Sequence, residues 1–316
     1  MKFIFTADWH IKTKFKDIPL GWLADRYVEF LYWLEEQRIA TGATALVIGG
    51  DVFDNIPSIF DVALFSSVFH VTNFEEYMIY PGNHEMLNKH KSFYETVHKI
   101  LVPYKKLTMI YDKLERWHDW LVVPYPLIKT VALPTAPTRI MSHVRAKSDR
   151  GLYDAEIDFN CFVEHPVVLL GDIHEHRQVS GHSNCWYSGA PYDTSMAPLP
   201  LSDKYVLLVD GDSVTPIPRL DKFRRLIKIE TTKDHYLSVK EKVAQSKHFY
   251  DIEVIVDNIN DLRDLADLDV KKKMRKSKYD LDASKTPEEQ MLEYLTDVLA
   301  MPNEEASKTL TVYQEL

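Results

Sequence analysis

The stretch Leu46–Asp54, with the sequence LVIGGDVFD, constrains the fold of this chain most strongly. Its apolar residues predict a short buried strand, two glycines let the backbone turn, and Asp51 follows at the strand's carboxyl end. In open α/β sheets, ligands bind beyond the carboxyl ends of the strands. A carboxylate there has two oxygens, so it can face two cations. The alternative is that Asp51 caps the next helix, because Asp is a common N-cap residue.

The first hundred residues alternate between expected strands and expected helices. In order, these elements are Met1–Ala7, Arg26–Ile39, Ala45–Ile48, a helix capped by Ser58, Tyr77–Tyr80 and Lys91–Leu101. Gly42 is expected to end the first helix. The order βαβαβα predicts a parallel sheet with helices packed on it.

The second half of the chain has a different sequence pattern, in which short expected strands are separated by proline and glycine turns. The expected strands are Leu121–Val123, Arg139–Ser142, Val167–Leu170, Trp186–Tyr187, Tyr205–Val209 and Val214–Ile217. We expect them to form a second sheet stacked on the first. Beyond Leu220, a strand at Phe223–Glu230, a helix at Leu237–Ser246 and a strand at Asp251–Val256 predict a small α+β domain.

Polar residues follow the expected strands at their carboxyl ends. They are Asp8, His10, Asp51, Asn83, His84, His143, Asp172 and His174. Carboxylates, imidazoles and one amide without a thiolate suit Mn, Fe or Zn, with Mg also compatible. Two sites that share one carboxylate would hold metals about 3.5–4 Å apart, the arrangement used for phosphoryl displacement.

Several local motifs carry a family resemblance. Asp8-x-His10, Gly50-Asp51-x-x-Asp54, Gly82-Asn83-His84-Glu85, His143 and Gly171-Asp172-Ile173-His174 resemble the calcineurin-like metallophosphoesterase signature. FTADWHIK, GGDVFD, PGNHE and YSGAP are similar to motifs of SbcD-type exonuclease subunits, the nuclease partners of the SbcC ATPase in double-strand-break processing. The resemblance implies an α/β fold, an αββα sandwich of two stacked mixed sheets flanked by helices. It also implies a small cap domain and a C-terminal helical tail.

The resemblance implies specific roles at the site. One metal would take Asp8, His10, Asp51 and His174, and the other would take Asp51, Asn83, His143 and Asp172. His84 would donate a proton toward the leaving-group oxygen, or it would only orient a ligand. Asp54 would orient His84 or a metal ligand, or it would cap the following helix.

The last motif departs from the family's usual G-H-x-H, because this chain has GDIHEH. In one alignment with the family motif, Asp172 takes the place of the first histidine and His174 is the second. In the other alignment, the two histidines of the motif are His174 and His176. We favour the first alignment. A carboxylate in place of an imidazole is a harder ligand, so it would make the second metal site more suitable for Mn or Mg. Arg177 would contact a phosphate, or it would be a solvated loop residue.

Charge gives no general sign of nucleic-acid binding, since the net charge is −9. Local contacts with backbone phosphates would come from Lys12, Lys14 and Lys16, which otherwise lie in a solvated loop. The basic run Lys271–Lys278 touches DNA or a partner, or it is a solvated linker.

The expected domains are a nuclease domain (1–220), a DNA-binding cap (221–270), and a basic linker with a partner-binding helix (271–316). The helix expected after Thr286 has Met291, Leu295 and Val298 on one face. By resemblance it would dock on an SbcC-type ATPase; otherwise it folds back on its own domain. By resemblance too, the chain would form a homodimer, and the helix bearing Phe60, Leu64 and Phe69 is one surface for it.

The remaining expectations concern compartment and rival functions. No run approaches the roughly 18–20 apolar residues of a membrane span, and the two cysteines, Cys161 and Cys185, suit a reducing, cytoplasmic compartment. The expected function is a metal-dependent DNA exo- or endonuclease subunit with two divalent ions, Mn first. The rivals are a phosphoprotein phosphatase, a small-molecule phosphodiesterase and a weakly active scaffolding subunit.

Overall fold

The computed structural model describes most of the first 256 residues and little of the chain beyond them. The described residues are 1–101, 104, 106–125, 127–147, 156–179, 181–220, 223–256, 271–274, 289, 292, 302 and 307. The chain forms two compact units. The first contains Met1–Ile227 and Lys247–Phe249, and the second contains Lys228–Ser246 and Tyr250–Leu316. Every residue predicted to bind metal lies in the first unit.

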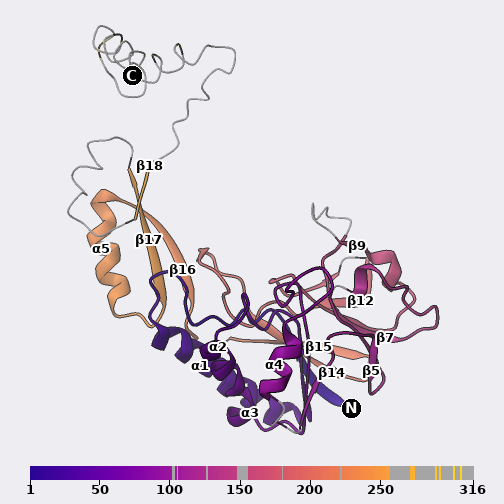
Figure 1. The fold of residues 1–316 in the computed structure, drawn as a ribbon. Coiled ribbons are helices and arrows are strands. Elements are labelled where there is room, and N and C mark those ends of the chain that lie inside the picture. The colour runs from indigo at the N-terminus through magenta and orange to yellow at the C-terminus, as the bar shows by residue number, and fades with distance from the viewer. Residues whose placement is uncertain are drawn as a thin grey trace. The chain divides into compact units, whose positions relative to one another are not determined.

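The first sheet has six strands in the order β15-β14-β1-β2-β3-β4 (Figure 1). Their bounds are β1 Lys2–Thr6, β2 Ala45–Gly49, β3 Glu76–Tyr80, β4 Leu107–Met109, β14 Tyr205–Asp210 and β15 Ser213–Pro218. Strands β1, β2 and β3 are parallel, as predicted, and β4, which was not predicted, adds a fourth parallel strand. The expectation that the last two strands join the second sheet is wrong. Strand β14 pairs antiparallel with β1, with Phe3 opposite Val209. Its apolar residues Leu207 and Val209 belong to the same core cluster as Phe3 and Phe5, which explains the pairing.

The second sheet also has six strands, in the order β11-β12-β10-β7-β6-β5. Their bounds are β5 Glu115–Trp117, β6 Trp120–Val123, β7 Arg139–His143, β10 Val168–Gly171, β11 Arg177–Val179 and β12 His182–Tyr187. Short strands β8 (Ala146–Lys147) and β9 (Ile157–Asp158) pair beside it, and β13 (Ala197–Pro198) follows it in the chain.

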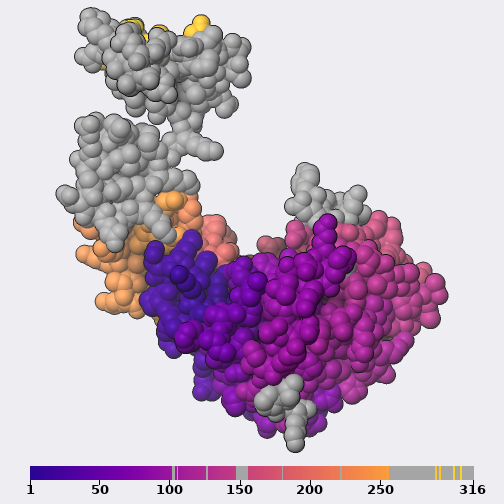
Figure 2. Space-filling view, viewed as in Figure 1, coloured from indigo at the N-terminus to yellow at the C-terminus, as the bar shows by residue number. Residues whose placement is uncertain are grey.

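Alternating side chains divide the core into layers. In β1, Phe3 and Phe5 face the second sheet and Ile4 faces the helices, since successive strand residues point to opposite faces. Phe3 makes edge-to-face contacts with Trp117 and Trp120 across the two sheets, at centroid distances of 5.6 and 5.4 Å. Figure 2 shows one outer face of the first unit with its side chains, viewed as in Figure 1.

Helices cover the outer face of the first sheet. They are α1 (Leu20–Thr41), α2 (Ile59–Ser66), α3 (Val68–Val71) and α4 (Tyr94–Leu101). Gly42 ends α1 in the left-handed conformation, with φ of 69°. Short 3₁₀-helices, η1 (Leu127–Lys129) and η2 (Phe159–Phe162), pack on the second sheet. The fold is thus mixed α/β with two stacked mixed sheets.

The second unit contains most of β16 (Leu226–Thr232), helix α5 (Lys233–Ala244), most of β17 (Phe249–Val256) and β18 (Lys271–Met274). Strand β18 pairs parallel with β17, so the start of the basic run is a strand rather than the expected linker. The helix expected after Thr286 lies outside the described residues, apart from single positions. None of the described helices combines the length and the apolar character of a membrane span.

Candidate metal centre

The predicted ligands follow neighbouring strands of both sheets at one edge. Asp8 and His10 follow β1, Asp51 follows β2, Asn83 follows β3, His143 ends β7, and Asp172 and His174 follow β10. Strands β1, β2 and β3 are adjacent in the first sheet, and β7 and β10 are adjacent in the second. All five run parallel to a neighbour, which brings residues that are far apart in sequence to one place.

The backbone is strained at four predicted ligands. Asp8, His10, Asp51 and Asp172 have φ values of 58°, 43°, 49° and 93°. Six described non-glycine residues have positive φ in all, so the strain is concentrated at this edge of the sheets. Such conformations persist only where the surroundings impose them.

Backbone hydrogen bonds join the loop after β1 to the loop after β2. Asp8 N donates to Gly50 O at 3.1 Å, and His10 N donates to Asp51 O at 2.9 Å. Between the two ligands, Trp9 is fully buried and its ring meets Phe30 edge to face at 5.2 Å. The apolar core therefore holds Asp8 and His10 in place from below.

The first cluster contains Asp8, His10 and His174, whose ligand atoms all lie within 4.8 Å of one another. The Nε2 atoms of His10 and His174 are 3.0 Å apart, and His174 Nε2 lies 3.9 Å from Asp8 Oδ1. His10 Nδ1 donates to Asp54 Oδ1 at 3.2 Å, and His174 Nδ1 contacts Thr194 Oγ1 at 2.9 Å. Each imidazole is thus fixed at Nδ1 and presents Nε2 to a common point, as metal-binding histidines do.

The second cluster contains Asp8, Asp51 and His143. His143 Nε2 lies 3.3 Å from Asp51 Oδ2 and 3.2 Å from Asn83 Oδ1. His143 Nδ1 donates to Gly49 O at 2.8 Å, so Nε2 faces the cluster. A Cβ at Gly50 would lie 2.4 Å from this ring, which explains the glycine. Asp51 is close to both clusters, because its Oδ2 is also 3.5 Å from His10 Nε2.

Asp172 lies beside the second cluster and is paired with Arg145. Arg145 Nε donates to Asp172 Oδ2 at 2.9 Å, and a terminal nitrogen donates to Oδ1 at 3.3 Å. Asp172 Oδ1 is 3.9 Å from His143 Nε2. A carboxylate oxygen has two lone pairs, so Oδ1 can accept from Arg145 and still face the cluster. His176 belongs to none of the donor groups found among the described residues, and its ring lies 4.5 Å from the Tyr205 ring, centroid to centroid.

His84 lies next to Asp51 at the open side of the site. Its backbone N donates to Asp51 Oδ1 at 3.0 Å, and its Nδ1 donates to the carbonyl of Asp54 at 2.6 Å. Its Nε2 lies 3.9 Å from Asp51 Oδ2, and the side chain is 39% exposed. Asp54 thus orients His10 with its carboxylate and His84 with its backbone. It does not cap α2, since Ser58 fills that position.

Glu85 is a structural member of the site whose role the sequence did not reveal. Its buried carboxylate accepts hydrogen bonds from the backbone N of Asp51 (2.9 Å), Phe53 (2.9 Å) and Gly82 (2.7 Å). It therefore ties the loop after β2 to the loop after β3. Burial, followed by the charge of Asp51, raises the pKa of Glu85 to about 7.

The charges of the site favour a cation. Burial raises the pKa of Asp8 to about 8, and the neighbouring carboxylates add to this shift. Burial and His10 lower the pKa of His174 to about 4, which keeps the imidazole neutral, as a metal ligand must be. Burial would raise the pKa of Asp51, but the His143 ring lowers it overall. Buried carboxylates and oriented imidazoles thus fit divalent metal ions by donor type and by charge.

The other predicted residues lie outside the clusters. Arg177 is in β11, with its guanidinium 5.5 Å from the Tyr187 ring centroid. Lys12 Nζ lies 3.0 Å from Asp54 Oδ1, and Lys12 and Lys14 line a pocket of about 280 Å³ with Asp54. Lys16 does not line this pocket.

Comparison with known proteins finds similarity to one family in the first part of the chain. Residues 1–143 match the sequence model of the calcineurin-like phosphoesterase family. The "Probable exonuclease subunit 1" of Escherichia phage T5 is 27% identical over 200 residues, which are 62% of this chain and 61% of that protein. The match thus spans less than two thirds of this relative.

Two solved structures show weaker similarity. The TT1561 protein of Thermus thermophilus is 13% identical with a TM-score of 0.40, over 69% of this chain and 98% of that one. The nuclease MPE of Pseudomonas putida is 12% identical with a TM-score of 0.31, over 68% and 87%. At these TM-scores neither structure bears on the function of this chain.

Replacing Glu85 tests the link between the two loops. In Glu85→Gln, one carboxylate oxygen becomes an NH₂ group that cannot accept a hydrogen bond. We expect the free energy of unfolding to fall by about 1–3 kcal/mol and Mn²⁺ to bind more weakly. Urea denaturation and calorimetric titration measure these effects. Glu95→Gln, on the exposed side of α4, should change neither, and wild-type behaviour of Glu85→Gln would contradict the role.

Replacing Asp172 tests whether it is a ligand. We expect Asp172→Ala to retain about one of two bound metal ions, because an ion at the second cluster loses the carboxylate beside His143. Elemental analysis of the dialysed protein measures the metal content. Asp119→Ala, at the opposite edge of the second sheet, is the control. Two bound ions in Asp172→Ala would show that Asp172 serves only to hold Arg145.

Proposed function

We propose that this chain is the nuclease subunit of a DNA-processing complex, built on a metallophosphoesterase domain whose residues 1–143 match the calcineurin-like phosphoesterase family. The domain makes it a metal-dependent phosphodiesterase, a hydrolase of ester bonds. The observation that carries the proposal is the position of Asp51. It belongs to the second cluster, its Oδ2 lies 3.5 Å from His10 Nε2 of the first cluster, and it accepts a hydrogen bond from the backbone of His84.

Two divalent ions fit the donor groups as follows. Asp8, His10, Asp51 and His174 would hold the first ion. Asp51, Asn83, His143 and Asp172 would hold the second. The absence of thiolates and the presence of carboxylates favour Mn²⁺. Bound ions of this kind lower the pKa of a water and polarise phosphoryl oxygens.

The protein's own groups orient the reaction. Asp51 has one oxygen toward His10 and His143 and the other toward the His84 backbone. The carbonyl of Asp54 can only accept, so His84 Nδ1 carries a proton. In the protonated ring, Nε2 is then the group that can donate to a leaving oxygen at the open side of the site. The buried Trp9 and the strained loops keep these groups from reorganising.

DNA is the substrate we propose. The similarity to a protein named as an exonuclease subunit of phage T5 supports a nuclease that works with another subunit. Lys12 and Lys14 lie beside Asp54, next to the first cluster, where they would meet backbone phosphates. We further propose that the second unit is a small DNA-binding domain. We also propose that two copies of the chain pair through the region of α2, where Ile59 and Phe60 are exposed.

Replacing His84 tests the catalytic assignment. We expect His84→Ala to keep both metal ions and to lose about 10²–10⁴-fold in rate, the range for general acid–base catalysis. The assay is cleavage of labelled linear and hairpin DNA with Mn²⁺, Mg²⁺ or EDTA. His118→Ala, in the turn before β6 at the opposite edge, should cleave like wild type.

The outcome also separates the rival functions. Turnover of p-nitrophenyl phosphodiesters or phosphopeptides with DNA left intact would replace the nuclease by a small-molecule phosphodiesterase or a phosphatase. A metal-loaded wild-type protein that cleaves none of them would favour a scaffolding role. Metal loss in His84→Ala would make His84 a ligand rather than a proton donor.

The partner proposal concerns residues beyond the described part of the chain. We propose that the helix after Thr286 docks on an SbcC-type ATPase subunit. Deletion of residues 280–316 should then abolish co-purification with that subunit and leave Mn²⁺-dependent cleavage of small phosphodiesters at the wild-type rate. An undiminished complex would rule out this docking site.

A further inference from the structure

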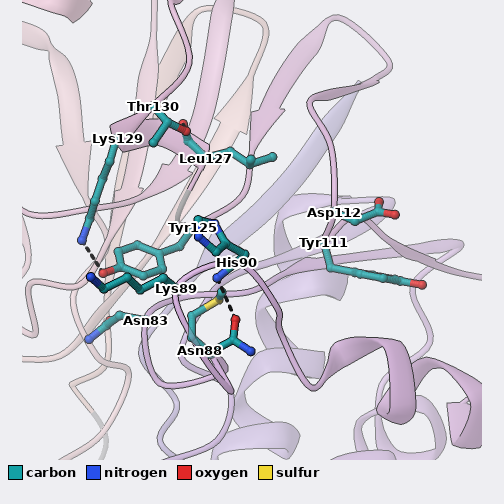
Figure 3. A pocket seen from close by; sticks show the side chains of 11 residues that line it. Asn83, Asn88, Lys89, His90, Tyr111, Asp112, Tyr125, Leu127, Lys129 and Thr130 are labelled. Atoms are coloured by element: carbon teal, nitrogen blue, oxygen red, sulfur yellow. Dashed lines mark hydrogen bonds between the residues drawn. The ribbon is translucent and has the colours of Figure 1, made fainter.

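A pocket of about 640 Å³ opens beside the second metal cluster (Figure 3). Predicted ligand Asn83 is part of its wall. The other lining residues are Met86, Asn88, Lys89, His90, Tyr111, Asp112, Tyr125, Leu127, Lys129 and Thr130. Pockets of about 300–1,000 Å³ hold small organic ligands, so one nucleotide unit fits this volume.

The topology explains why the pocket adjoins the metals. Its three lining segments follow β3, β4 and β6 at their carboxyl ends. Strand β4 is the neighbour of β3 in the first sheet, and β6 is the neighbour of β7 in the second. The pocket thus lies at the same edge of the sheets as the predicted metal ligands, one strand further along in each sheet.

One wall of the pocket is fixed by a small polar network. Lys129 Nζ lies 4.3 Å from the centroid of the Tyr125 ring and also contacts the Tyr125 hydroxyl and Glu156. The Tyr125 hydroxyl donates to Glu156 at 3.0 Å. Because these three side chains bind one another, the charge of Lys129 is compensated by Glu156. This wall therefore offers a ligand a rigid surface and no free charge.

The other side of the pocket has groups that are open to a ligand. Tyr111 meets the His98 ring at a centroid distance of 5.9 Å, and no described residue bonds to its hydroxyl. Among the described residues, none pairs with the exposed Lys89. Figure 3 shows Tyr111 and Tyr125 on different sides of the His90 loop. The lining thus offers an aromatic ring, the apolar chains of Met86 and Leu127, and a single unpaired cation.

From these groups we propose that the pocket binds the nucleotide next to the scissile phosphate. The base would lie against Tyr111 and the apolar side chains, and a backbone phosphate would meet Lys89. Asp112 at the wall offsets part of the positive charge, which favours a base with one phosphate over a highly charged ligand. This inference rests on the proposed nuclease function and specifies how that site selects nucleic acid.

Two small esters with the same leaving group test the proposal. The p-nitrophenyl ester of thymidine 5′-monophosphate carries a nucleoside, and methyl p-nitrophenyl phosphate does not. Tyr111 also packs against the core, so Tyr111→Leu is the variant that removes the ring and retains apolar contact. We expect its KM for the thymidine ester to rise about tenfold, the effect of losing one stacking partner. The kinetics with the methyl ester should stay within twofold of wild type.

Lys89→Gln provides the second test at an exposed position. We expect it to bind single-stranded DNA more weakly and to reduce the salt dependence of binding by about one phosphate contact. Tyr32→Leu in α1, where Tyr32 is 61% exposed, is the control for both assays. Equal losses on the two esters, no loss on either, or slower turnover of a phosphopeptide alone would overturn the proposal. A wild-type protein that cleaves no DNA would instead reject the nuclease function itself.

Discussion

The structure depends on bringing several buried carboxylates to one point. Asp8, Asp51 and Glu85 are all buried, and the cost of removing such charges from water is several kcal/mol each unless they are paired. The protein offsets part of this cost with His143 and with backbone N–H groups. The negative charge that stays uncompensated makes the site suited to cations. It also explains why hydrogen bonds hold the surrounding backbone in place.

The two stacked sheets supply what this concentration of charge requires. The first sheet contributes loops that are linked to each other by hydrogen bonds and by Glu85, while the second contributes His143 and His174 from above. The apolar layer between the sheets, with Phe3 against Trp117 and Trp120, sets the spacing of the two sheets. Catalysis by metal ions needs this fixed spacing, since the donor atoms must be in position before the ions bind.

Sequence reasoning predicted the ligand-bearing strands because each has a local signature, an apolar run followed by a polar residue. It did not place β14 in the first sheet, because antiparallel pairing with β1 joins residues about two hundred positions apart and leaves no local mark. The same holds for the pairing of Arg145 with Asp172. Glu85 was visible in the GNHE motif, yet nothing local shows that it binds backbone groups of another loop. The roles of the predicted ligands stay predictions until metal binding is measured.

The central position of β1 has a consequence for biosynthesis. Strand β1 needs β14, which follows it by about two hundred residues and ends at Asp210, as one of its two neighbours. Contacts of such long sequence separation are slow to form. The first cluster likewise needs His174, the last of its residues to be made. A chain that has been synthesised only as far as β10 therefore lacks both the antiparallel neighbour of β1 and one donor residue of the first cluster.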